Sequence, residues 1–189
     1  MTLDNYDKRM IGNVEAVSRS EVLSFSKTNC EYIDLRAGFG VKNEACVYEG
    51  PSKIRATRCS SRETKIQTVR LLSIEIIEKL RERGFRVRPG VMGEHITTGG
   101  IDISDLPLHT HLHVGPEVVI KVVVSRRDES PPEEGRVDPI SGLTSDDFLL
   151  SRSGIEGIVI QGGRVRPNDL IEIELPIADF SNAEREYLG

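Results

Sequence analysis

Short stretches in which apolar and polar residues alternate recur along the chain, and this pattern predicts mainly β structure. Alternation sends successive side chains to opposite faces of a strand, so that one face can pack on a core. The stretch EVVIKVVV at residues 117–124 is also rich in β-branched residues, which favour strands. The other stretches expected as strands are residues 11–17, 30–35, 154–161 and 170–175. So many short strands predict a closed or half-closed β-barrel.

Only one stretch has clear helical spacing, and it begins just after Ser73. Serine is a favourable residue for the start of a helix, and Gly84 is a favourable residue for its end. We therefore expect a helix from about Ile74 to Arg83 that packs one apolar face on the barrel. This face consists of Ile74, Ile77 and Leu80, with Ile76 beside them. The predicted fold class is a mainly β barrel with one or two helices.

The length of 189 residues fits one domain with enough bulk for a core. We expect a polar N-terminal tail at residues 1–9, a barrel domain at residues 10–176 and a C-terminal tail at residues 177–189. Inside the domain, residues 50–65 and the acidic, Pro-rich residues 127–148 are expected to be loops.

Charge and composition argue against two kinds of partner. The net charge is −5 without a basic block, and Trp is absent, so nucleic-acid binding through clustered cations or stacked bases is not expected. The chain has no run of about 18 apolar residues, so no membrane-spanning helix is predicted. The first residues, MTLDNYDKRM, lack the apolar core of a signal peptide, so we expect a cytoplasmic protein. With nucleic acids and membranes disfavoured, a small molecule is the expected partner. The three cysteines are too few and too widely spaced for a disulfide framework or a zinc knuckle.

Three of the four histidines occupy alternate positions, and they are His109, His111 and His113. In a strand this spacing places the three rings on one face. Two imidazoles at this spacing can bind one metal ion, so His109 and His111 are candidate metal ligands. Glu94 or His95 in the preceding turn is a candidate for a further ligand. The alternative is a polar strand face on the outside of the barrel or at its mouth.

The segment PGVMGEHITTGGIDI at residues 89–103 carries the most informative motif of the chain. It resembles the signature of MOSC domains, the C-terminal domain type of molybdenum-cofactor sulfurases, in which Asn usually stands at the position of His95. The block RSGIEGIVIQGGRVRPNDLIEI near the C-terminus also resembles this family. Lys27 falls where the family often has Lys. Residues 40–46 resemble a family turn of the form G-V-x-G-D-x-H, with Cys46 in place of His.

This resemblance implies a β-barrel that handles sulfur or the molybdenum cofactor, and family descriptions also attach pyridoxal phosphate. The chain departs from the family where sulfur-handling members have a cysteine, because residues 126–132 read RRDESPP. Persulfide transfer and molybdenum ligation both require a sulfur donor. A Schiff base with pyridoxal phosphate would have to form on Lys27 or Lys42, and nothing else in the sequence supports either lysine.

Together these observations predict a polar pocket around residues 93–98. The candidate catalytic residues are Glu94, His95 and Arg126, and the candidate ligand-binding residues are Lys27, Thr97, Thr98, Arg127 and Cys46. Carboxyl and imidazole groups transfer protons, hydroxyl groups donate hydrogen bonds, and guanidinium groups match planar oxyanions. Adjacent strand residues face opposite ways, so Glu94 and His95 enter one pocket only if the chain bends. Each of these residues also has a purely structural interpretation. Glu94 would cap a turn, and the two threonines would be present because they favour a strand. The cationic side chains would be solvated, and Cys46 would be an ordinary thiol.

Three functions remain open at this level. In the first hypothesis, the chain is a divergent MOSC protein that binds an anionic ligand or one related to sulfur or the molybdenum cofactor. Alternatively it is a repurposed lyase, isomerase or cyclase that uses Glu94 and the histidines for acid–base or metal chemistry. As a third hypothesis, it is a non-catalytic interaction domain that contacts a partner through residues 127–148.

Overall fold

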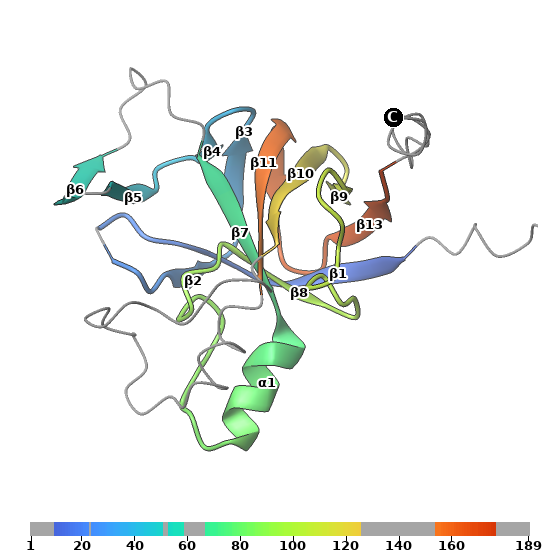
Figure 1. Ribbon diagram of the computed structural model, residues 1–189, viewed down its shortest axis with the longest axis horizontal. Coiled ribbons are helices and arrows are strands. Elements are labelled where there is room, and N and C mark those ends of the chain that lie inside the picture. Colours follow the sequence, from blue (N-terminus) through green and yellow to red (C-terminus); the bar gives the residue numbers. More distant parts are fainter. Residues whose placement is uncertain (1–9, 23, 51–52, 59–66, 126–153, 177–189) are drawn as a thin grey trace, which may run out of the picture.

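A computed structural model describes residues 10–22, 24–50, 53–58, 67–125 and 154–176, and its ribbon is drawn in Figure 1. The first half contains strands β1 (Ile11–Arg19), β2 (Thr28–Cys30), β3 (Ile33–Arg36), β4 (Gly40–Val41), β5 (Ala45–Gly50), β6 (Lys53–Arg58) and β7 (Thr68–Ser73). Helix α1 (Ile74–Glu82) follows directly. The remaining strands are β8 (Ile96–Gly99), β9 (His111–Val114), β10 (Val118–Ser125), β11 (Ile155–Gln161), β12 (Gly163–Val165) and β13 (Leu170–Glu174). The described part of the chain is therefore mainly β with one helix, as the sequence predicted.

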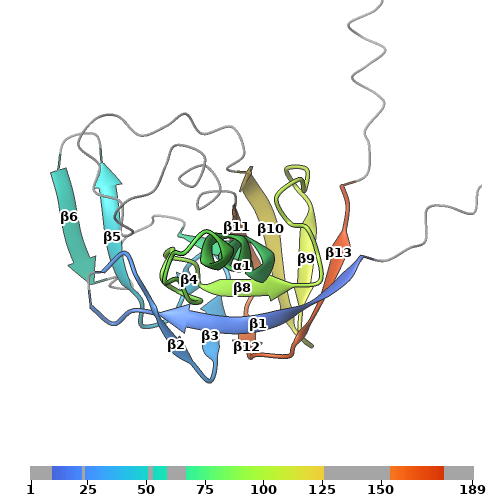
Figure 2. The ribbon, with the colours of Figure 1, turned by 90° about the horizontal axis from the view of Figure 1, so that it is seen from below.

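The largest sheet closes into a barrel. Its strands follow the order β13-β9-β10-β11-β7-β8-β1-β2, and β1 also pairs with β13, so seven strands form a ring. The β7–β8 pair is parallel, and the other pairs of the ring are antiparallel. Closure leaves no free edge among the ring strands, because each one is paired on both sides. Figure 2 shows β1, β8, β9, β10 and β13 around the barrel wall, with the β5–β6 hairpin to one side.

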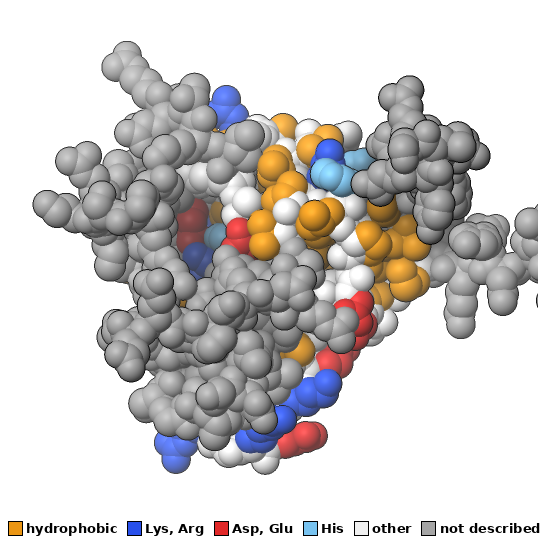
Figure 3. Space-filling model, viewed as in Figure 1, with side chains coloured by type: hydrophobic (Ala, Val, Ile, Leu, Met, Phe, Trp, Pro, Cys, Tyr) orange, Lys and Arg blue, Asp and Glu red, His pale blue; other side chains and the backbone are white. Residues whose placement is uncertain are grey.

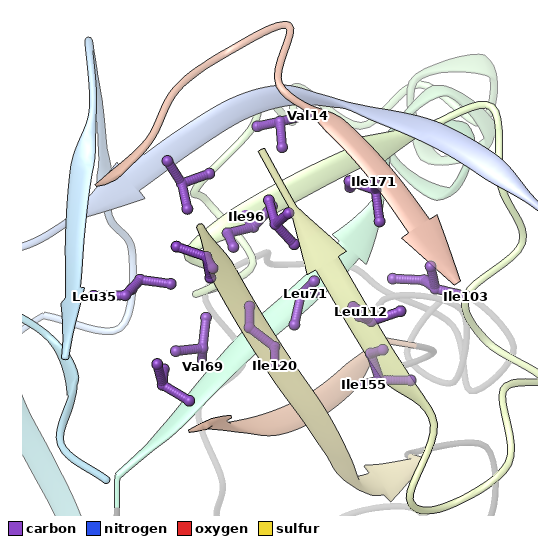
Figure 4. Packing of buried hydrophobic residues seen from close by; sticks show 14 of the residues in the cluster. Val14, Leu35, Val69, Leu71, Ile96, Ile103, Leu112, Ile120, Ile155 and Ile171 are labelled. Carbon is purple, nitrogen blue, oxygen red and sulfur yellow. The ribbon is translucent and has the colours of Figure 1, made fainter. Parts of the chain in front are cut away.

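Branched aliphatic side chains from the ring strands fill the interior of the barrel (Figure 4). Ile96, Leu112, Ile120 and Ile171 are fully buried there. The strands alternate buried and partly exposed positions, as in Leu170–Glu174, which explains why their sequences alternate. The hydrophobic pattern of the sequence thus corresponds to the inward face of the barrel.

Helix α1 covers one end of the barrel, below β7 in Figure 1. Its buried residues are Ile76, Ile77 and Leu80, which pack with Leu72, Val87 and Met92 in a second apolar cluster. Ile74 is only partly buried, so the buried face is rotated from the predicted one toward Ile76. Ser73 occupies the N-cap position, although its side chain makes no capping hydrogen bond. The predicted helix and most of its apolar face are confirmed.

Three local predictions need correction. Residues 30–35 do not form one strand, because the chain leaves β2 at Cys30 and enters β3 at Ile33. Residues 50–65 are not wholly a loop, because β6 pairs with β5 in a hairpin. His109 does not lie in a strand, because β9 begins at His111 and His109 has a positive φ of 71° in the preceding turn. At residues 30–35 and at His109 a turn interrupts the pattern, whereas β6 forms because it pairs with β5.

A second, smaller sheet has the order β12-β3-β4 and lies against the barrel. In β3 the residues Ile33 and Leu35 are buried while Asp34 and Arg36 point away from the core. In β12 Val165 is buried while Arg164 is exposed. The helix of the described segments is too short and too polar to cross a membrane.

Candidate functional site

Three charged or polar side chains from distant parts of the sequence meet beside the barrel. Lys27 precedes β2, Glu44 precedes β5, and His95 lies in the turn before β8. The Lys27 Nζ atom lies 2.5 Å from Glu44 Oε1, and His95 Nε2 lies 3.6 Å from the same oxygen. The three side chains retain only 10%, 5% and 11% of their exposure, respectively. We call this group the Lys27–Glu44–His95 cluster.

A hydrogen bond from the backbone sets the tautomer of His95. The N–H group of Arg70 donates to His95 Nδ1 over 3.0 Å. The ring nitrogen that accepts this bond carries no proton, so the proton of a neutral ring sits on Nε2 and faces Glu44. Burial lowers the pKa of His95 and outweighs the raising effect of Glu44, while the charges of Lys27 and Arg70 lower it further. His95 is therefore a neutral donor near pH 7.

Glu44 is the ionised acid of the cluster. Burial raises its pKa, but the hydrogen bonds from His95 and Lys27 and the positive charge of Lys27 outweigh burial and bring the pKa down to about 2. Its second oxygen accepts the backbone N–H of Ser20 over 2.8 Å. The sequence offered one signal for Glu44, since it occupies the acidic position of the family-like turn at residues 40–46.

Arg70 brings a second positive charge to the same region, and the sequence analysis missed it. It lies in β7 between Val69 and Leu71, and all three residues are buried. Its Nη1 atom donates to the carbonyl oxygen of Met92 over 2.7 Å. Its guanidinium carbon lies 5.9 Å from the centre of the Phe25 ring. The available signal was a charged residue inside an otherwise apolar strand, since a buried charge requires specific partners.

Glu94 faces a different set of partners from His95. Its Oε1 atom accepts the backbone N–H of Gly90 over 2.6 Å and the hydroxyl of Thr97 over 3.2 Å. Its Oε2 atom is buried and has no hydrogen-bond partner among the described residues. Burial raises the pKa of Glu94 above its ordinary value despite the lowering effects of these bonds and of Arg70. Glu94 thus closes the 90–95 turn and also keeps one oxygen unsatisfied.

The other predicted site residues have different positions. Thr97 and Thr98 are fully buried in β8, where Thr97 supports Glu94 and Thr98 Oγ1 has no described partner. Arg126 and Arg127 lie outside the described residues. The backbone of Cys46 belongs to β5, but its side chain lies outside the description.

The histidines of the β9 region do not converge. His113 Nε2 pairs with Glu174 Oε2 at 2.7 Å on the exposed side of β9. His111 is partly buried on the same strand, whereas His109 is exposed in the turn before it. Within the described ranges, no group of three or more His, Cys, Asp or Glu side chains is placed to hold a metal ion. Metal binding by His109 and His111 stays a prediction.

The described residues do not fit the two cofactors that the sequence resemblance implies. Molybdenum ligation requires a thiolate, yet burial raises the pKa of Cys30 and its thiol faces the carbonyl oxygen of Val17 at 3.6 Å. A Schiff base requires a lysine nitrogen that is free to react, yet the Lys27 Nζ atom is engaged by Glu44 at 2.5 Å. Lys42 is exposed beside β4, apart from this ion pair.

A concave space lies next to the cluster. A cavity of about 330 Å³ is lined by residues that include Arg19, Ser20, Thr28 and Cys30. Ser20 binds Glu44 through its N–H group, and Thr28 directly follows Lys27, so the cavity and the cluster share one neighbourhood. In Figure 3, basic, acidic and histidine side chains gather in a hollow on the left of the described surface.

Comparison of whole structures supports the fold. The YuaD protein from Bacillus subtilis superposes with a TM-score of 0.58 and 17% identity, covering 88% of this chain and 97% of that protein. A hypothetical protein gives a TM-score of 0.52 and 15% identity, and the match covers 91% of this chain and 72% of that protein. YiiM from Geobacillus stearothermophilus gives a TM-score of 0.48 and 15% identity, over 90% of this chain and 77% of that protein.

No protein-family model matches the sequence, and no curated protein matches it. At the identities found, the structural likeness concerns the fold alone. The closed barrel agrees with the fold expected from the signature motif. The chain therefore has a MOSC-like β-barrel fold.

Proposed function

We propose that the protein binds a small anionic ligand beside the Lys27–Glu44–His95 cluster. The observation that carries this proposal is the near-complete burial of an ion pair next to a cavity. Removing Lys27 and Glu44 from water costs free energy that a well-packed apolar pair would not cost. Buried ionisable groups with shifted pKa values beside a cavity are typical of binding and catalytic sites.

The charges of the site favour an anion over a cation. Lys27 and Arg70 are cationic, Glu44 is ionised, and burial of His95 keeps its ring neutral. The raised pKa of Glu94 disfavours a second negative charge there. An anionic group close to the cluster would thus be attracted by an ammonium and a guanidinium, which both bind oxyanions well. Anions related to sulfur or the molybdenum cofactor are the first class to test, although the fold alone does not select a ligand.

Native mass spectrometry of the purified protein, without added ligand, tests this proposal. A copurified small molecule should appear in the wild-type protein and in Lys79→Met, because Lys79 is exposed on α1. The same mass should be lost from Lys27→Met. Retention of the ligand by Lys27→Met, with native thermal stability, would show that the cluster is not the binding site.

A second function, acid–base catalysis by Glu94, is favoured by one specific observation. A buried carboxyl group with a raised pKa and an unsatisfied oxygen has the properties of a general acid or base. A screen for lyase and isomerase turnover on small carbonyl substrates would test it. Turnover that persists in Glu94→Gln would rule out this role.

A further inference from the structure

A larger and more basic cavity lies on a different part of the molecule, over the small β12-β3-β4 sheet. Its volume is about 750 Å³, within the range of small-molecule sites. Residues 34–37 of β3 and its following turn, Lys42, and residues 162–164 and 166 line it. In Figure 1, β3 and β4 lie at the end of the molecule opposite α1, and in Figure 2 β3 and β12 lie next to each other.

Strand register explains why charged side chains gather on this sheet. β12 pairs with β3 so that Arg164 lies opposite Asp34, with Gly163 opposite Leu35. Leu35 points into the core in Figure 4, so its neighbours in the strand point outward. The outward positions in the sequences IDLR and GRVR are Asp34, Arg36, Arg164 and Arg166. Alternation therefore places three arginines on one outer face.

Among the described residues, Asp34 is the only acid that lines the cavity, and it is already engaged. Asp34 forms a two-bond ion pair with Arg164, at 2.8 Å for Nε–Oδ1 and 3.2 Å for Nη2–Oδ2. Arg164 also stacks on Tyr32, 3.8 Å from the ring centre. The hydrogen bond from Arg164 lowers the pKa of Asp34, so this pair stays ionised at neutral pH. Arg164 is thereby held in place as part of the wall.

Three further cations of this cavity have no such partner. Arg36 is only in distant contact with the Phe39 ring, at 5.9 Å. Lys42 and Arg166 are exposed. None of these three side chains forms an ion pair with any residue in the described ranges. Three positive charges without an ion-pair partner among the described residues thus lie around one hollow, although the net charge of the chain is −5.

We propose that this cavity, the β3–β12 pocket, binds a small phosphorylated molecule. Guanidinium groups match two phosphate oxygens at once, and an ammonium adds a point charge. A cavity of about 750 Å³ exceeds the size of a single phosphate ion, so a ligand with at least two phosphoryl groups fits the spread of the cations. Because the cations are exposed, added salt should weaken the binding.

Isothermal titration with sodium pyrophosphate at low ionic strength tests the proposal. The double variant Arg36→Gln/Arg166→Gln should bind at least about tenfold more weakly than wild type, because charge-assisted hydrogen bonds are lost. Arg86→Gln removes an exposed arginine outside the pocket and should change the affinity less than about twofold. Thermal unfolding of each variant checks that Asp34 and Arg164 still hold the sheet together.

Three outcomes would overturn the β3–β12 pocket. These are no binding of pyrophosphate to the wild type, equal weakening by Arg86→Gln, and equal affinity for citrate, which carries carboxylates instead of phosphates. Lys27→Met separates this inference from the proposed function. It should leave pyrophosphate binding intact, because Lys27 does not line the pocket.

Discussion

At the scale of single residues, Glu44 and Glu94 are both buried but respond to burial in opposite ways. Two hydrogen-bonding neighbours, Lys27 and His95, stabilise the charged form of Glu44. Glu94 has bonds to only one of its oxygens, and burial dominates its pKa. The partners of Glu44 therefore favour its ionised form, whereas burial disfavours the ionised form of Glu94.

The first residue-scale prediction concerns acid stability and Glu44→Gln. The folded pKa of Glu44, about 2, lies below its ordinary value of 4.5, so Glu44 stabilises the fold above pH 4.5. This stabilisation is lost as the pH falls from 4.5 toward 2. Glu44→Gln should cost about 2 kcal/mol at pH 7 and make urea unfolding less dependent on pH in that window. An unchanged pH dependence would contradict the assigned ion pair.

Glu94→Gln should have the opposite pH signature. Because the folded pKa of Glu94 is raised, its contribution to stability is greatest at low pH and falls as the pH rises through the folded pKa. Glutamine keeps an oxygen that can accept from Gly90 without carrying charge. We therefore expect the unfolding midpoint of Glu94→Gln at pH 7 to equal or exceed that of the wild type. A large loss of stability would show that the charge itself is needed in the fold.

At the scale of elements, helix α1 is the clearest case in which local sequence sufficed. Its start after Ser73, its end before Gly84 and its apolar face follow from spacing and end residues alone. Residues 50–65 misled the same reasoning, because the strand Lys53–Arg58 is rich in basic residues and depends on pairing with β5. Elements with their own periodicity were predictable, and elements that depend on a partner strand were not.

The buried face of α1 gives an element-scale prediction. Leu80 is fully buried and Glu78 is exposed. Leu80→Ala should lower the free energy of unfolding by about 3 kcal/mol, because a buried leucine leaves a cavity. Glu78→Ala should change it by less than about 0.5 kcal/mol. Similar small effects from both variants, measured by urea unfolding, would mean that the wrong face of the helix is assigned.

The turn at residues 90–95 depends on Gly90. This glycine has φ +88°, and a Cβ atom there would lie 2.6 Å from the carbonyl oxygen of Lys27. Gly84 has a similar φ of +92° but open space around it, so it provides a matched control. Gly84→Ala should cost about 1 kcal/mol from backbone strain alone. Gly90→Ala should cost clearly more and weaken ligand binding at the Lys27–Glu44–His95 cluster, as thermal unfolding and native mass spectrometry would reveal.

At the scale of the whole molecule, closure of the barrel brings together segments that the sequence keeps apart. The site receives Lys27, Glu44, Arg70 and His95 from four separate segments, and the β1–β2, β1–β8 and β7–β8 pairs bring the strands beside these segments together. Lys27 and His95 were predicted because they lie in family-like motifs. Arg70 and the role of Glu44 were not, because their significance appears only when distant strands are placed side by side. The same holds for the β3–β12 pocket, whose charges depend on register between residues 34 and 164.

The last prediction concerns sulfur and also involves the whole chain. The chain has three cysteines, and none falls between Arg126 and Pro132, where sulfur-handling relatives of this fold are expected to have one. Only a thiolate carries sulfane sulfur efficiently, and burial raises the pKa of Cys30 away from that form. A triple Cys30→Ser/Cys46→Ser/Cys59→Ser variant should therefore retain ligand binding, since Lys27, Arg70 and His95 need no thiol. Peptide mapping after exposure to a persulfide donor provides the direct measurement. Stoichiometric labelling of Cys46, together with loss of binding in Cys46→Ser, would instead place a sulfur carrier in β5 and make the anion a sulfur-containing substrate.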